Sequence, residues 1–209
     1  MVLDLLHRIA ANPGVYDWIQ HSVGCDQVFR RVQKHFISAP ARTVLEVGAG
    51  TGLLRPYLPS TTKYIWLDCD PVKLAGFRRR NHSDDAVLGD ATRICIGNAA
   101  VRDVLCVSVT HHIPDEMAAR MFSELARVAS ERLIFLDPVL SSTLTGKALW
   151  SLDRGSFPRR PERLRELIGV DFDIAFQEEF EVMHRYLCCV ATPKRLGTPA
   201  NPQSVVPSP

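Results

Sequence analysis

The stretch Val44-Leu45-Glu46-Val47-Gly48-Ala49-Gly50-Thr51-Gly52 decides the fold. Its first four residues are apolar except for one acid, a pattern that predicts a short, buried strand of a parallel sheet. The three glycines that follow at alternate positions can adopt positive φ angles and leave bare backbone for a ligand to lie against. A strand, a glycine loop and a helix in this order present unpaired backbone N–H groups at the helix start. The stretch therefore predicts a ligand site at the carboxyl end of a central strand.

Strand-like and helical patterns alternate after this stretch. The expected strands cover residues 63–67, 86–88, 104–109 and 133–136, and the expected helices cover residues 53–58, 71–80, 115–129 and 161–168. Such alternation predicts an α/β fold in which a doubly wound, mainly parallel sheet carries helices on both faces. Two extended runs, residues 172–182 and 186–191, follow each other so closely that they predict an antiparallel C-terminal hairpin at one edge of the sheet.

The chain is expected to divide into an arm, one domain and a tail. Residues 1–40 contain apolar side chains at helical spacing and predict a helical N-terminal arm, which either covers the ligand as a lid or packs against the sheet. Residues 41–192 form the expected α/β domain. Residues 193–209 hold five prolines and little apolar periodicity, so we expect a disordered, proline-rich tail.

Composition narrows the class of protein. The 209 residues are 46% hydrophobic and 23% charged, which suits one globular domain with a sizeable core. The net charge of +2 is too small to indicate nucleic acid or an anionic membrane surface as the main partner. No apolar run approaches the length of a membrane span, and the first residues lack the pattern of a signal peptide. We therefore expect a cytoplasmic protein with no membrane partner.

The six cysteines contain no C-x-x-C pair, and most of them lie in apolar runs. This distribution indicates reduced, mostly buried thiols rather than disulfides or metal ligands. We therefore expect no metal site. The sequence leaves the oligomeric state open.

Polar side chains occur where the expected strands end. They are Glu46, Asp68, Asp90, His111, His112 and Asp137. Because ligands of open α/β sheets bind outside the carboxyl ends of the strands, we expect these side chains to meet at one edge of the sheet.

The spacing of the glycines distinguishes between two classes of ligand. Dinucleotide-binding loops follow the pattern G-x-G-x-x-G, in which the third glycine packs the helix against the strand. Here the third glycine is Gly52, one residue too early, and position 53 is Leu53. The register therefore disfavours a nicotinamide cofactor without excluding it.

Several motifs together resemble those of class I S-adenosylmethionine-dependent methyltransferases. The series from Glu46 to Gly52 resembles their first motif, and Asp68 is similar to their ribose-binding acid. Gly89-Asp90 is similar to their adenine-proximal pair, residues 104–115 resemble their fourth-strand motif, and the final hairpin matches their reversed last strand. The resemblance covers residues 40–192 and implies a Rossmann-like fold with S-adenosylmethionine as cofactor.

The resemblance also implies a set of cofactor-binding residues. They are Glu46, Gly48, Ala49, Gly50, Gly52, Asp68, Cys69, Asp90, Ala91 and Ser108. Asp68 would accept hydrogen bonds from the ribose hydroxyls, whereas the alternative is a second helix-capping acid beside Asp70. Asp90 would accept from the adenine amino group, whereas the alternative is a turn aspartate. Glu46 would orient the loop through its amides.

His111 and His112 stand where a general base would be needed if the acceptor is a hydroxyl, and the pKa of histidine suits that role. The alternative is that one histidine caps the next helix while the other only lines the pocket. Adjacent positions point in different directions, so one base at most is expected. The same spacing makes joint metal ligation with Asp115 awkward.

These inferences lead to a methyltransferase that acts on a small organic molecule by in-line displacement at the sulfonium. The alternative is a regulatory or scaffold protein that binds S-adenosylmethionine or S-adenosylhomocysteine without catalysis. The lack of a basic surface or of an RNA-binding appendage argues against nucleic acid as the acceptor.

Overall fold

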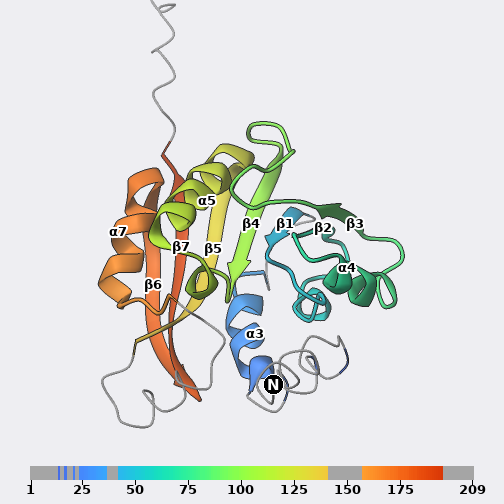
Figure 1. Ribbon diagram of the computed structural model, residues 1–209, viewed down its shortest axis with the longest axis horizontal. Coiled ribbons are helices and arrows are strands. Elements are labelled where there is room, and N and C mark those ends of the chain that lie inside the picture. The colour runs from blue at the N-terminus through green and yellow to red at the C-terminus, as the bar shows by residue number, and fades with distance from the viewer. Residues whose placement is uncertain are drawn as a thin grey trace, which may run out of the picture.

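A computed structural model describes residues 14, 17, 21, 24–36, 42–140 and 157–194. Within these residues, seven strands form one sheet in the order β3-β2-β1-β4-β5-β7-β6 (Figure 1). The strands are β1 (Thr43–Val47), β2 (Lys63–Asp68), β3 (Asp85–Leu88), β4 (Val101–Val107), β5 (Ala129–Val139), β6 (Phe172–Val182) and β7 (His184–Pro193). The first five strands pair in parallel, whereas β7 is antiparallel to both β5 and β6. The expected fold class is confirmed.

Helices cover both faces of the sheet (Figure 1). They are α3 (Cys25–Gln33), α4 (Pro71–Arg78), α5 (Asp115–Val128) and α7 (Pro161–Asp171), with 3₁₀ turns at Arg55–Tyr57 and Thr110–His112. Side chains of successive strand residues point to opposite faces. Leu45 and Val47 accordingly join the core under α5 and α7, while Val44 joins the core under α3 and α4. This two-sided burial explains why the β1 sequence is almost continuously apolar.

The order of the strands places β1 at the centre, with β2 on one side and β4 on the other. The chain leaves β1 for β2 and later returns to β4, so the direction of winding reverses between β1 and β4. Loops at such a reversal diverge and open a crevice at the carboxyl ends of the strands. The glycine loop lies at this crevice because it follows β1 directly.

Two elements differ from the expectations. The helix expected at residues 53–58 is only the 3₁₀ turn Arg55–Tyr57, because prolines at positions 56 and 59 remove backbone donors from so short a segment. The fifth strand is longer than expected and runs on through Pro138, which pairs with Tyr186 of β7. Strand β4 pairs with β5 only as far as Leu136, so the missing N–H of Pro138 removes no hydrogen bond on that side.

The expected hairpin is confirmed, with Met183 as the single residue between β6 and β7. All six cysteines are free, and Cys69 and Cys95 are the two exposed ones. In the described part of the chain, no helix is long and apolar enough to cross a membrane. Most of the expected arm and all of the tail after Lys194 lie outside the described residues. The boundaries proposed for arm, domain and tail therefore stay predictions.

A buried carboxylate holds the opposite end of the sheet together. Asp103 of β4 has no exposed surface and accepts hydrogen bonds from the guanidinium groups of Arg42 and Arg132. Arg42 is also nearly buried, with 9% of its side chain exposed. Arg42 also pairs with the partly exposed Glu131, but removing Asp103 would take the buried carboxylate partner from both arginines, which costs more than the pair contributes.

We expect Asp103→Ala to lower the free energy of unfolding by about 3 kcal/mol, because it removes the buried carboxylate to which both arginines donate. Arg102→Ala is the matched control, since Arg102 forms an exposed pair with Glu131 and should cost about 0.5 kcal/mol or less. Urea denaturation of both variants measures the difference. Equal losses in the two variants would contradict the importance assigned to burial.

Candidate functional site

The glycine loop after β1 is fixed by its own backbone. Gly48, Gly50 and Gly52 have φ angles of 67°, 54° and 77°, in the region that L-residues with side chains rarely adopt. The N–H of Ala49 donates to the carbonyl of Leu67 on β2 at 3.0 Å. The loop is therefore tied to the end of the neighbouring strand.

Two of the glycines are required by close packing. A Cβ on Gly48 would lie 2.4 Å from a methyl carbon of Val109, and a Cβ on Gly52 would lie 2.4 Å from the ring of Phe77. Phe77 belongs to α4 and stacks on Trp66, whose indole N–H donates to the carbonyl of Gly50 at 2.8 Å. Gly52 thus lets α4 approach the loop and faces a side chain rather than a cavity.

Asp68, at the end of β2, connects the glycine loop to α4. One carboxylate oxygen accepts from the N–H of Gly50 at 2.8 Å, and the other accepts from the N–H of Asp70 at 3.0 Å. Asp70 itself caps α4 by accepting from Val72 at 2.8 Å, as its position before Pro71 predicted. Each oxygen of Asp68 keeps a further lone pair, so the carboxylate can hold the loop and still accept from a ligand hydroxyl.

Asp90 follows β3 and forms a turn of its own. Its carboxylate accepts from both the N–H and the hydroxyl of Thr92, each at 2.8 Å. The turn aspartate considered as an alternative is therefore present. The side chain is nevertheless exposed and lies on the wall of a cavity, so the turn and contact with a ligand are compatible.

A cavity of about 580 Å³ opens beside the loop, within the size range of cofactor sites. It is lined by Gly48, Gly50, Leu67, Asp68, Cys69, Asp70, Lys73, Gly89, Asp90, Ala91, Thr92, Ser108, Val109, His112, Ile113 and Met117. Carboxylates stand at the ends of β2 and β3, and apolar side chains from the segment after β4 face them. This combination fits a ligand with a hydroxylated sugar and a flat heterocycle.

A second, smaller cavity of about 70 Å³ lies between the loop and α3. It is lined by Cys25, Val28, Phe29, Glu46, Gly48, Ala49, Gly50, Thr51, Leu53, Leu54, Val107, Ser108 and Tyr186. The two cavities share Gly48, Gly50 and Ser108. One elongated ligand can therefore lie across these three residues with an end in each cavity.

Glu46 lies at the wall of the smaller cavity and is 4% exposed. Burial raises the pKa of its carboxyl group to about 8, although the hydroxyl of Tyr64 donates to it and opposes the shift, and the charge of Asp68 adds to the rise. The hydrogen bond from Tyr64 on β2 differs from the expectation that Glu46 binds the amides of the loop. In the parallel register Glu46 pairs with Trp66, two residues after Tyr64. The side chains of Glu46 and Tyr64 therefore lie on the same face of neighbouring strands, within reach of each other.

The two histidines after β4 have different surroundings. His111 is 5% exposed, and its Nδ1 lies 2.5 Å from a carboxylate oxygen of the fully buried Asp137 on β5. Asp137 also accepts from the N–H and the hydroxyl of Thr110, the first at 2.6 Å. His112 is exposed and lines the larger cavity. The structure therefore brings His112 to the ligand site, and His111 lines neither cavity.

Sequence reasoning missed several lining residues. Ile113 and Met117 carry no chemical signal, and Met117 belonged to the apolar stripe of a predicted helix. Lys73 follows the helix cap and enters the larger cavity from α4. Tyr186 and Cys25 reach the smaller cavity from segments far away in the sequence, a proximity that no local pattern shows.

Residues 44–132 match the family model described as a methyltransferase domain. This part of the chain therefore resembles a methyltransferase domain. The predicted resemblance to class I S-adenosylmethionine-dependent methyltransferases is confirmed by this match, and the order of the strands around the glycine loop agrees with it. No curated protein matches the chain.

Solved structures share the fold at low sequence identity. The methyltransferase for magnesium protoporphyrin IX from Synechocystis PCC 6803, solved with bound S-adenosylhomocysteine, has a TM-score of 0.67 at 20% identity, and the match covers 81% of this chain and 84% of that one. The PH0226 protein of Pyrococcus horikoshii OT3 gives 0.67 at 16% identity, covering 86% and 92%. The [4+2]-cyclase SpnF gives 0.67 at 15% identity, covering 80% and 81%. The fold of this chain therefore also occurs in a protein named for a different reaction.

The raised pKa of Glu46 predicts a pH dependence of stability. The carboxyl group keeps its proton up to about pH 8 in the folded chain but loses it above about 4.5 in the unfolded chain. The contribution of this carboxyl group to the free energy of unfolding is therefore fully present below its pKa in the unfolded chain and is lost as the pH rises toward 8. Glu46→Gln cannot ionise, so its stability relative to the wild type should increase by a few kcal/mol over this window.

Urea denaturation just above pH 4.5 and near pH 8 measures this change. Glu116→Gln, at an exposed position of α5, is the control. A constant difference between Glu46→Gln and the wild type across the window would mean that Glu46 is already charged in the folded chain.

Proposed function

We propose that the chain transfers the methyl group of S-adenosylmethionine to a small organic acceptor. The observation that carries this proposal is the pair of cavities that meet at Gly48, Gly50 and Ser108. A cofactor with an adenosyl group at one end and an amino acid at the other matches the unequal sizes of the two cavities. The carboxylates and the glycine loop fit the polar groups of such a ligand.

The larger cavity would take the adenosyl group. Asp68 would accept from the ribose hydroxyls through the lone pairs that its two backbone hydrogen bonds leave over. Asp90 and the backbone of Ala91 would meet the edge of the adenine, with Ile113 and Met117 against its faces. Cys69 lines the same wall. The amino-acid end would lie along the loop in the smaller cavity, whose wall includes Glu46 and Ala49.

The cofactor supplies an activated methyl group, so the protein has to position the acceptor rather than create a leaving group. Positioning of reactants in line can contribute on the order of 7–11 kcal/mol. An acceptor would enter where the cavities meet, beside Ser108. A small organic molecule is the acceptor class proposed, because the net charge of +2 gives no general attraction for nucleic acid. The Synechocystis relative in fold is itself named for a porphyrin.

The two histidines would have separate roles. His112 is the candidate for the base, because it is exposed and touches the larger cavity. His111 is a positioning residue: Asp137 accepts from its ring and thereby fixes the 3₁₀ turn that carries both histidines. The backbone N–H of His112 donates to Val109 at 3.0 Å within the same turn.

Asp68→Asn should weaken the binding of S-adenosylhomocysteine about 10- to 100-fold, because the amide loses the charge and can accept only one of the two backbone hydrogen bonds that Asp68 accepts. Isothermal titration calorimetry gives the dissociation constants. Asp173→Asn on β6 is the control and should bind like the wild type. If the affinity of Asp68→Asn equalled that of the wild type, the assignment of Asp68 as the residue that binds the ribose would be wrong.

Transfer of a radiolabelled methyl group from the cofactor to a pool of small metabolites distinguishes catalysis from binding alone. A methyltransferase yields a labelled product and S-adenosylhomocysteine in equal amounts. Tight binding of the cofactor without a labelled product would favour the non-catalytic alternative.

With a labelled acceptor in hand, His112→Ala should lower kcat about 100-fold and remove the acidic limb of the pH profile, since the base is lost. His111→Ala should also lower kcat, but His111→Asn should restore it, because its amide can donate to Asp137 as the ring does. If His111→Asn did not restore kcat and His112→Ala were fully active, His111 would be the base instead of His112.

A further inference from the structure

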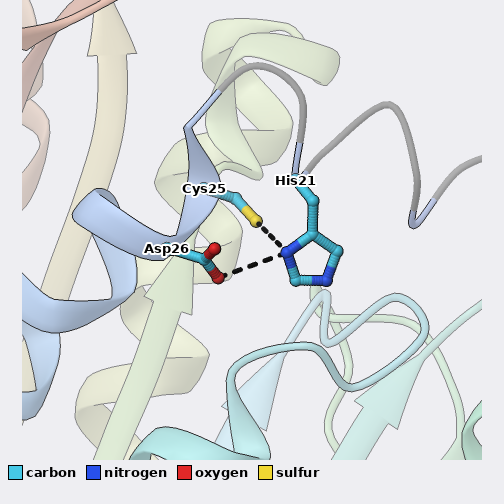
Figure 2. A group of neighbouring side chains, drawn as sticks. All are labelled: His21, Cys25 and Asp26. Carbon is cyan, nitrogen blue, oxygen red and sulfur yellow. Dashed lines mark hydrogen bonds and ion pairs between the residues drawn. The ribbon is translucent and has the colours of Figure 1, made fainter.

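Three side chains of different chemistry converge at the start of α3, outside the larger cavity (Figure 2). The Nδ1 atom of His21 lies 3.7 Å from the sulfur of Cys25 and 3.2 Å from a carboxylate oxygen of Asp26. The three potential ligand atoms all lie within 4.8 Å of one another. Figure 2 shows the thiol and the carboxylate directed at the same ring nitrogen.

This arrangement differs from that of a catalytic triad. In a triad, the nucleophile and the orienting acid contact opposite nitrogens of the imidazole, so that one ring nitrogen accepts a proton while the other donates. Here Cys25 and Asp26 both face Nδ1 of His21. A single nitrogen carries at most one proton and has one direction for it, so it cannot relay between the two groups. Convergence on one point is instead the geometry of shared coordination.

The distances suit a tetrahedral ion. Zn²⁺ binds sulfur at about 2.3 Å and nitrogen or oxygen at about 2.0–2.2 Å, so neighbouring ligand atoms in a tetrahedron stand roughly 3.3–3.6 Å apart. The two separations around Nδ1 of His21, 3.7 and 3.2 Å, lie within a few tenths of an ångström of that range. The ligand atoms of Cys25 and Asp26 lie within 4.8 Å of each other, and the half-exposed side chains of His21 and Asp26 have room to rotate toward a shared ion.

The backbone and a neighbouring side chain hold the group in place. Gly24 has a φ angle of 84°, and its N–H donates to the carbonyl of His21 at 3.2 Å, so a tight turn returns the imidazole to the helix start. A Cβ on Gly24 would lie 2.9 Å from a methyl carbon of Val182, which fixes this turn against β6. The hydroxyl of Tyr57 donates to the carboxylate of Asp26 and orients it, as outer-sphere partners of metal ligands do.

We propose that His21, Cys25 and Asp26 form a three-ligand site for a divalent cation of intermediate softness, Zn²⁺ by preference, with the fourth coordination position open. Sulfur, nitrogen and oxygen together select such an ion over Mg²⁺ or Ca²⁺, which prefer oxygen alone. Cys25 also lines the smaller cavity, so the ion would fix the wall of that cavity formed by α3. The proposal revises the expectation of no metal site, which considered C-x-x-C spacing and the pair His111 and His112 with Asp115, but not these three residues.

The test uses the full-length chain after treatment with a chelator. Titration with Zn²⁺ in a calorimeter should show one equivalent bound, and Co²⁺ should produce a thiolate-to-cobalt charge-transfer band. Cys25→Ser should abolish this band, and both Cys25→Ser and His21→Ala should weaken Zn²⁺ binding by more than 100-fold. Tyr57→Phe should weaken it by roughly 10–100-fold, the usual cost of losing an outer-sphere partner.

Cys95→Ser is the matched control, because Cys95 is exposed and belongs to neither cavity. It should keep the full affinity and the charge-transfer band. Circular dichroism checks that each variant is folded, and Asp26→Asn provides a second variant should Cys25→Ser unfold.

Three outcomes would overturn the proposal: no saturable binding, a cobalt spectrum without the thiolate band, or equal affinity in the wild type and in folded variants of all three ligands. Binding of S-adenosylhomocysteine to the metal-free chain is measured separately. A failed metal site therefore leaves the proposed methyl transfer untouched.

Discussion

The carboxylate of Asp68 is the interaction on which the rest of the site depends. It joins the N–H of Gly50, in the loop after β1, to the N–H of Asp70, at the start of α4. Both amides belong to the segments that directly follow two neighbouring parallel strands, and Asp68 supplies each of them with a hydrogen-bond acceptor. One side chain thus fixes the loop, starts a helix and stands at the cavity wall. The two hydrogen bonds that order the loop and the start of α4 therefore also fix the position of the carboxylate at the cavity wall.

Much of the architecture could be predicted because it depends on local patterns. The run from Val44 to Val47 is apolar except for Glu46, and Asp70-Pro71 is a helix start on sequence grounds alone. Lengths were harder to predict. Strand β5 continues through Pro138 because a distant partner, β7, pairs with it there, and no neighbouring residue carries that information.

Among the candidate site residues, those set by local sequence patterns could be predicted, whereas those set by distant partners could not. Asp68 and Asp90 were recognisable because they end predicted strands, and parallel strands end at one edge of a sheet. The separate surroundings of His111 and His112 could not be foreseen, because the difference depends on Asp137 one strand away. Gly52 had the spacing of a ligand residue, yet its missing side chain makes room for Phe77. The proximity of His21 and Cys25 could not be predicted either, because it depends on the turn at Gly24, which brings the two side chains together.

The position of β7 has a consequence for biosynthesis. The last strand of the described residues, His184–Pro193, lies between β5 and β6 rather than outside them. Within these residues β6 pairs only with β7, so β6 can join the sheet only after β7 has been synthesised, and Tyr186 of β7 reaches the smaller cavity only then. A nascent chain that stops short of β7 leaves the backbone N–H and C=O groups along one edge of β5 unpaired. The sheet and the wall of the smaller cavity are therefore completed by the same late segment of the chain.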